Sequence, residues 1–238
     1  MGIQHPKTEA ESNISSRETL SNSNTQQNPK QDAPSTTGSM LRLSLWVSFA
    51  AWISNFDNGY SGTVLIMPSY NKTFGSCEQV LDPDTYADIQ HCTLTPLQQS
   101  LISLNYLFIA VGGGIAGLTG QYCGRRGSIQ VGCVLAIIGA AGMLGTGGSF
   151  LHYMVCRSIS AVGIGHFIAA SATYGSECIV ASKRGLSLGL YNVGLAMGNV
   201  ASSAVCAGSA RLEPNNNWQW KTPILCQIPL ELFLVLAS

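Results

Sequence analysis

Long apolar stretches alternate with short polar segments along most of this chain. Six such stretches follow Met40, at 43–66, 97–119, 129–149, 151–173, 186–208 and 222–238. A bilayer core about 30 Å thick requires roughly 20 apolar residues in a helix, and these stretches supply that length. The pattern therefore predicts an all-α membrane protein with six transmembrane helices over residues 41–238. Buried helices of a large soluble protein are the alternative, but several long uncharged spans with polar breaks are rare in soluble domains.

Residues 1–40 have the opposite composition, since Ser, Thr, Asn, Gln, Pro, Lys and Glu dominate and large apolar groups are scarce. Such a segment buries too little apolar surface to offset its ordering entropy, so we expect a disordered tail. It lacks the basic start and apolar core of a signal peptide. Only 10% of all residues are charged and the net charge is +0, so nothing favours nucleic acid as a partner.

The basic residues in the short loops predict the orientation in the membrane. Arg125 and Arg126 lie between the second and third spans, and Lys183 and Arg184 lie between the fourth and fifth. The loop between the first two spans has only Lys72 among several acidic residues. Cytoplasmic loops carry an excess of Lys and Arg, so the tail is predicted to be cytoplasmic and the first loop to lie outside.

Two features of that outer loop predict covalent modification. Asn71 begins the sequence NKT, which is either a glycosylation acceptor or an unused match, while the match at Asn13 lies on the cytoplasmic side. Cys77 and Cys92 share the loop and are candidates for a disulfide, or else remain free thiols. The other six cysteines show no metal-ligand spacing, so no metal is expected.

Asp57 is the one carboxylate of the first predicted span, and Arg157 is the only strong base inside any of the spans. Asp57 lies nine residues from the outer end of the first span, or roughly 13 Å deep at 1.5 Å per residue. Arg157 lies six residues into the fourth span, or roughly 9 Å deep. An isolated charge in a membrane is expensive, so the matching depths predict an ion pair. The pair either only holds two helices together or acts as a protonatable switch, and both interpretations stay open.

Five motifs occur along the predicted spans: FDNGYSGTVLIMPSY in the first span, GLTGQYCGRRGSIQVG, CRSISAVGIG, YGSECIVASKRG and WQWKTPILCQ in the sixth. Together they resemble the N-terminal half of the sugar porter family in the major facilitator superfamily. They occur in the family's order, at the predicted helix boundaries, between about residues 50 and 230. The resemblance implies one six-helix half of a twelve-helix transporter. It also implies that the missing C-terminal half, or a second chain, is needed to complete a solute site between the halves.

The resemblance also assigns roles to particular residues. It implies that Arg125, Arg126, Glu177 and Arg184 form a cytoplasmic gate, although ordinary topology-setting charge explains the same residues. It assigns solute contacts to Asn192, where sugar-binding members have Gln, and to Asn199 and Gln227. Asn192 and Asn199 share one helix face. Gln121, Val180 and Cys156 depart from the family's Asp, Pro and Gly, and the shorter Asn192 leaves the solute's identity open.

Further polar and small residues inside the spans have structural explanations. His166 either lines the cavity or titrates, but packing in the helix bundle is the preferred interpretation. Asn105 and Tyr106 either line the path or bond between helices. The glycines of the second and fourth spans are interpreted as sites of close helix contact, at 112–114, 117, 120, 163 and 165. No strand precedes them, so a nucleotide-binding loop is excluded.

The sequence thus predicts a secondary transporter of sugars or related polyhydroxylated solutes, proton-coupled through Asp57 and Arg157. We expect a multi-pass protein of the plasma membrane that needs no cofactor. A solute sensor of the same fold and a nonfunctional transporter fragment are the alternatives. No nucleophile with a base and no metal-ligand cluster is evident, so an enzyme is not expected.

Overall fold

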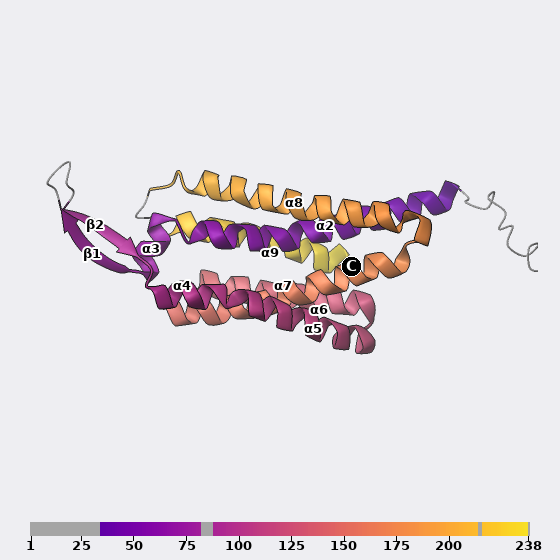
Figure 1. Ribbon diagram of the computed structural model, residues 1–238, viewed down its shortest axis with the longest axis horizontal. Coiled ribbons are helices and arrows are strands. Elements are labelled where there is room, and N and C mark those ends of the chain that lie inside the picture. Colours follow the sequence, from indigo (N-terminus) through magenta and orange to yellow (C-terminus); the bar gives the residue numbers. More distant parts are fainter. Residues whose placement is uncertain (1–33, 82–87, 214–215, 238) are drawn as a thin grey trace, which may run out of the picture. The chain divides into compact units, whose positions relative to one another are not determined.

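Helices make up most of the computed structural model, which describes residues 34–81, 88–213 and 216–237. The chain forms two compact units, Met1–Leu41 and Arg42–Ser238, and the second contains most of the helical residues. The elements (Figure 1) are α2 (Pro34–Val64), α3 (Pro68–Phe74), β1 (Ser76–Leu81), β2 (Asp88–Thr93), α4 (Pro96–Ser103), α5 (Asn105–Tyr122), α6 (Gly124–Leu144), α7 (Phe150–Cys178), η1 (Ala181–Lys183), α8 (Arg184–Ser209) and α9 (Trp218–Ala237).

Each of the six predicted spans corresponds to a helix, with α4 and α5 together forming the second. Leu104 separates those two, but its φ of −59° and ψ of −19° are helical, so they continue as one span. The third span is displaced from its predicted range, because α6 ends at Leu144 rather than at 149. Helix α2 begins at Pro34, inside the segment assigned to the tail, and residues 1–33 lie outside the described residues.

Local sequence signals explain several helix ends. Thr95 and Gln98 form a reciprocal capping box ahead of α4, in which each side chain bonds the other's backbone N–H. Gly124 adopts a φ of 71° where the chain turns from α5 into α6. That left-handed conformation favours glycine, and it lets the second and third spans reverse direction within a very short loop.

The loop after α3 contains a β-hairpin, which the sequence pattern did not predict. Strands β1 and β2 pair antiparallel, and their register places Cys77 opposite Cys92. The two sulfurs form a disulfide, as the shared loop had suggested. Residues 82–87, between the strands, lie outside the described residues.

Glycines allow α5, α6 and α7 to pack with their backbones close together. A side chain at Gly112 of α5 would overlap the Val162 carbonyl of α7, and one at Gly165 would overlap the Ile109 carbonyl. A side chain at Gly163 would likewise meet the Ala136 backbone nitrogen of α6, at 2.5 Å. Small residues at such positions let membrane helices approach closely, which confirms that interpretation for these three glycines.

The interpretation fails for other glycines of α5. A side chain at position 114 or 117 would meet nothing within 4 Å, and one at 113 would make only ordinary contact, with its nearest neighbour at 3.7 Å. The spacing of glycines along one helix therefore did not distinguish the packed face from the open one.

An aromatic cluster fixes the hairpin end of the bundle. The rings of Tyr70 and Phe74 on α3 pack against Tyr153 of α7 and Trp220 of α9, with centroids 4.9–6.0 Å apart. All four are largely buried. Aromatic pairs at such distances stabilise beyond the area they bury, so α3 is anchored between the two long helices.

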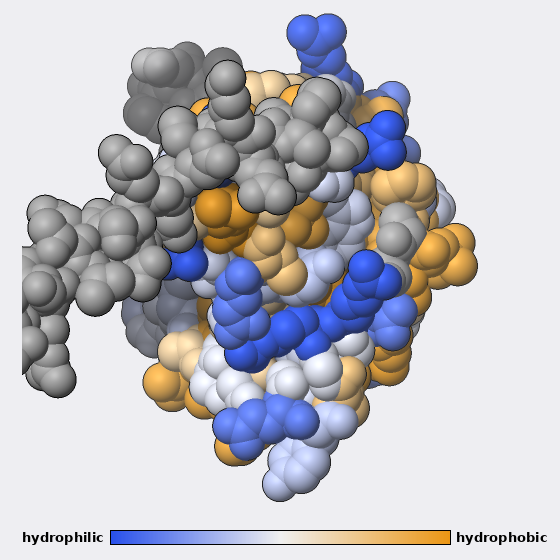
Figure 2. Space-filling model, turned by 90° about the vertical axis from the view of Figure 1, so that its right-hand side faces the viewer, coloured by the Kyte–Doolittle hydropathy of each residue, from blue (hydrophilic) through white to orange (hydrophobic). Residues whose placement is uncertain are grey.

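Three segments of the described chain are long and apolar enough by themselves to cross a membrane: Pro96–Tyr122, Gly124–Leu144 and Phe150–Cys178. The other long helices contain more polar residues, such as the Asn and Ser residues of α8. Large apolar side chains are exposed along the bundle, including Tyr106, Val193 and Leu236. Hydrophilic residues instead gather at the end where α5 meets α6 and α7 meets α8 (Figure 2).

Candidate functional site

Asp57 and Arg157 form an ion pair inside the helix bundle. Arg157 Nη1 on α7 donates to Asp57 Oδ1 on α2 at 2.7 Å. The aspartate side chain is 0% exposed and the arginine side chain 3% exposed, so neither charge can be hydrated from outside. The pairing predicted from the depths of the two residues is thereby confirmed, whereas a role in proton coupling stays a prediction.

Tyr60 connects this pair to α9. Its hydroxyl lies 3.0 Å from Arg157 Nη1 and 2.8 Å from Asp57 Oδ1, and it is also 2.8 Å from Oε1 of Gln227. A tyrosine hydroxyl has one proton to donate, so it serves either Asp57 or Gln227 at any moment. The arginine also lies over the Tyr60 ring, 5.4 Å from its centroid.

Glu231 is a second buried carboxylate, and the sequence interpretation missed it. It lies on α9, one turn after Gln227, and the Gln227 amide Nε2 donates to its Oε1. The residue is 1% exposed. The signal was present in the sequence, since an acid four residues after Gln227 falls inside the sixth apolar stretch. Glu231 is therefore a further member of the hydrogen-bonded network that Tyr60 and Gln227 carry from α2 and α7 to α9.

The three predicted solute contacts do not share one surface. Asn192 and Asn199 are both exposed on α8, as their common helix face implied. Gln227 is 0% exposed, and its amide group is hydrogen-bonded to Tyr60 and Glu231. In this conformation it belongs to the buried network, so its predicted contact with solute requires a rearrangement of α9.

A second ion pair lies at the end of the bundle where α5 meets α6. Arg125 binds Glu177 of α7 through two nitrogens, with Nε 2.8 Å from Oε2 and Nη2 bonded to Oε1. The side chains are 38% and 47% exposed. The fork geometry is the bidentate arrangement that arginine makes with carboxylates. Two of the four predicted gate residues are therefore in contact.

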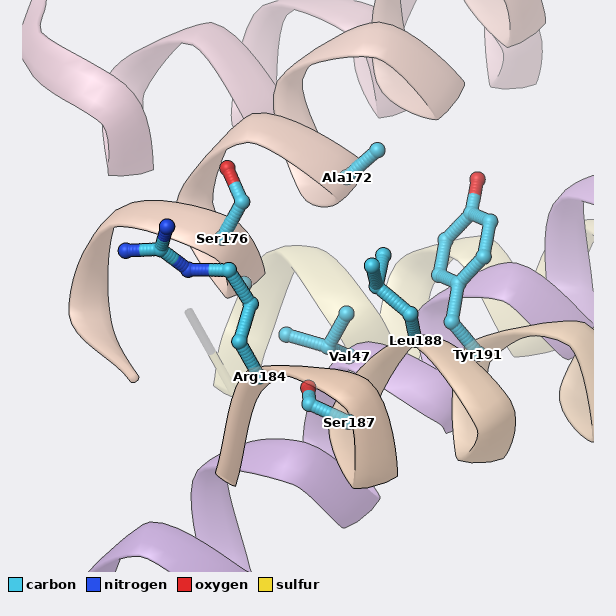
Figure 3. Close-up of a pocket in the computed structure, with 8 residues that line it drawn as sticks. Val47, Ala172, Ser176, Arg184, Ser187, Leu188 and Tyr191 are labelled. Atoms are coloured by element: carbon cyan, nitrogen blue, oxygen red, sulfur yellow. The ribbon is translucent and has the colours of Figure 1, made fainter. Parts of the chain in front are cut away.

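The other two gate residues do not join this pair. Within the described residues, neither Arg126 nor Arg184 makes an ion pair. Arg184 instead lines a small pocket between α7 and α8, and its side chain extends toward the wall that carries Ser176 (Figure 3). Tyr191 and Val47 line the same pocket. The arrangement links Arg184 to the contact between the fourth and fifth spans rather than to Glu177.

His166 is packed in the bundle, as preferred from the sequence. Its Nε2 lies 2.8 Å from Thr119 Oγ1 of α5 and 3.0 Å from Ser128 Oγ of α6, and the residue is 0% exposed. These bonds join three helices. Asn105 is also buried, whereas Tyr106 is 69% exposed, so the two neighbours face different surroundings.

The hairpin end carries the predicted modification sites. Cys77 and Cys92 are linked by the disulfide between the two strands. Asn71 lies in the middle of α3 and is half-buried, with its side-chain oxygen buried, and its glycosylation stays a prediction. Among the described residues, no group of three or more His, Cys, Asp or Glu side chains could hold a metal ion.

Residues 43–238 match the family described as sugar (and other) transporter. A quinate permease from Neurospora terricola is 27% identical over 194 residues, covering 80% of this chain and 34% of that protein. Hexose transporter HXT14 from Saccharomyces cerevisiae is 26% identical over 187 residues, covering 76% and 34%. The chain thus spans about a third of the length of these relatives, and both are transporters rather than enzymes.

Solved structures show the same fold. The inward-open xylose transporter XylE from E. coli superimposes with a TM-score of 0.65 at 18% identity, covering 83% of this chain and 47% of XylE. The proton:xylose symporter XylE bound to 6-bromo-6-deoxy-D-glucose gives a TM-score of 0.68 at 17% identity, covering 84% and 44%. The helices therefore have the arrangement of roughly half of a major facilitator superfamily protein, as expected.

Proposed function

Because the chain belongs to the sugar (and other) transporter family, and is therefore an integral membrane protein, we propose that it forms the N-terminal half of a proton-coupled transporter. The solute is a sugar or a related polyhydroxylated compound such as quinate. Support comes from the quinate permeases and hexose transporters among its relatives. Transport follows alternating access, in which a second six-helix half or a second chain completes the solute site.

The observation that carries the proposal is the buried ion pair of Asp57 and Arg157. Two charges removed from water are retained in a membrane protein mainly where they serve an ion or solute path. Protonation of Asp57 neutralises the acceptor of Arg157 and weakens the bond between α2 and α7. A proton thereby favours a different arrangement of these helices, which is the requirement for coupling.

The exposed pair of Arg125 and Glu177 acts in this proposal as a gate at the cytoplasmic end. It joins the start of α6 to the end of α7. Basic residues concentrate at this end, which supports a cytoplasmic location for it and for the N-terminus. The hairpin, with its disulfide, then faces the oxidising exterior of the plasma membrane.

Uptake into vesicles tests the function directly. The full-length protein is reconstituted into liposomes, and uptake of labelled xylose, glucose and quinate is measured with and without an inward proton gradient. We expect the gradient to accelerate uptake of one of these solutes. Asp57→Asn should abolish the acceleration, because an amide side chain cannot take up the proton, while solute exchange without a gradient should continue.

A matched control is Glu213→Gln, which removes an exposed carboxylate outside the network. This variant should respond to the gradient like the wild type. Wild-type uptake at the same rate with and without the proton gradient would contradict proton coupling. Binding of a solute with no uptake at all would instead favour a sensor of the same fold.

A further inference from the structure

Glu231 is a buried carboxylate that forms no ion pair in the part of the chain that the structure describes. Within the described residues, the ion pairs are Arg125 with Glu177 and Arg157 with Asp57, so Glu231 has no ionic partner. Its Oε2 is buried and makes no hydrogen bond there. An ionised carboxylate in such surroundings keeps only the hydrogen bond from Gln227 in place of its hydration, which is a costly arrangement in a protein.

The groups that face Glu231 give the charge of the cluster. From α2 come Asp57 and the neutral Tyr60, from α7 comes Arg157, and from α6 comes the Cys133 thiol. Helix α8 has no charged residue between 185 and 209, and the basic residue of α3 is exposed at the hairpin end. Two carboxyl groups therefore share one guanidinium.

Arginine keeps its proton in proteins, so the cluster holds one positive charge. Asp57 neutralises that charge directly, at 2.7 Å, whereas Glu231 contacts the guanidinium only through Gln227 and Tyr60. With both acids ionised, the buried cluster would carry a net negative charge. One bound proton restores neutrality, and the acid that lacks an ionic partner is the place for it.

We propose that Glu231 is a proton-binding site and carries a proton while Asp57 is paired with Arg157. The proposal rests on the proposed function in that Glu231 then supplies a second site for the coupled proton. When the helices rearrange and water reaches α9, the carboxylic acid gives its proton to water and becomes a carboxylate. Gln227 accommodates both states, since its amide can donate to the carboxylate or, after rotation, accept from the acid.

Infrared spectra of the wild type and its variants, compared by difference, test this site without solute or gradient. A protonated carboxyl group has a C=O stretch that an ionised one lacks, and deuteration shifts it. For the full-length protein in lipid at neutral pH, we expect this band in the wild type and its loss in Glu231→Gln. We also expect its loss in Asp57→Asn, because Glu231 then ionises as the remaining counterion of Arg157.

Controls separate the site from misfolding and from other acids. Glu213→Gln removes an exposed carboxylate and should leave the band in place. Gln227→Leu keeps the acid but removes its hydrogen bond, so the band should shift in frequency and persist. Persistence of the unshifted band in Glu231→Gln would overturn the proposal, as would persistence in Asp57→Asn or an unshifted band in Gln227→Leu.

The result is independent of the uptake experiment. Uptake that ignores a proton gradient would contradict the coupling proposed for Asp57, whereas a band that Glu231→Gln removes would still support proton binding at Glu231. A gradient-dependent uptake that Glu231→Gln does not alter, together with an unchanged band, would overturn the role of Glu231 alone.

Discussion

Substitution of Asp57 by Asn isolates the cost of leaving Arg157 without a charged partner. The arginine is 3% exposed, so water cannot replace the carboxylate, and the guanidinium cannot lose its proton. Tyr60 remains as an acceptor 3.0 Å from Nη1 but carries no charge. Breaking a buried pair in this way costs about 3–5 kcal/mol. We expect the lower end of that range if Glu231 ionises in response.

The substitution Arg157→Met should cost less, because both remaining acids can bind protons and become neutral. Loss of the hydrogen bonds alone corresponds to about 1–3 kcal/mol. Removing both charges, in Asp57→Asn with Arg157→Met, should give a protein more stable than Asp57→Asn alone, since no unpaired charge remains.

The assay is thermal unfolding of the purified protein in detergent, followed by gel filtration of the surviving fraction. At about 2–4 °C per kcal/mol for a chain of this size, Asp57→Asn should lower the apparent Tm by roughly 6–20 °C. The double variant should recover part of that loss. A double variant less stable than Asp57→Asn would refute the reasoning, because it would show that the two charges do not compensate each other.

Three further predictions concern packing, the disulfide and the gate. Gly165→Leu should lower the apparent Tm strongly, since overpacking costs about 1–3 kcal/mol or more, whereas Gly114→Leu, where a side chain meets nothing within 4 Å, should leave it unchanged. Peptide mapping by mass spectrometry without reduction should give a linked peptide that Cys77→Ser eliminates, and alkylation of both wild-type cysteines would contradict it. Glu177→Arg should alter the uptake rate while changing stability by less than about 1 kcal/mol, and Arg125→Glu in the same chain should restore the rate; no restoration would argue against the gate.

Much of the fold follows from features that depend on one span at a time. The length of each apolar stretch predicts six helices, because a bilayer sets a minimum span. The depths of Asp57 and Arg157 predict their contact, since the high cost of an isolated buried charge demands a partner. The shared loop predicts the pairing of Cys77 and Cys92, which the hairpin register achieves.

Other features depend on how helices face one another, which no single stretch determines. Gln227 is buried because α9 turns it toward α2, whereas the amides of Asn192 and Asn199 stay exposed on α8. Arg184 lies close in sequence to Glu177 but points into a pocket between α7 and α8.

Two groups of long helices in the second unit are each held by close glycine contacts, α5 with α6 and α7, and α2 with α8, and α9 contacts both groups. Close glycine contacts join α5, α6 and α7, and α2 likewise meets α8 at Gly59, beside Ser202. Asp57 reaches across from α2 to α7, and Glu231 on α9 faces Cys133 on α6.

Both proposed proton sites therefore lie where these groups meet, with Asp57 between α2 and α7 and Glu231 on α9, which contacts α6 and α8. By contrast, the proposed gate pair of Arg125 and Glu177 lies within the first group, α5 to α7, about 30 Å along α7 from Arg157. In the proposed coupling, a proton bound at either acid changes how the two groups attract each other while the glycine contacts within each group stay intact. We expect such a change to move helices as rigid sets.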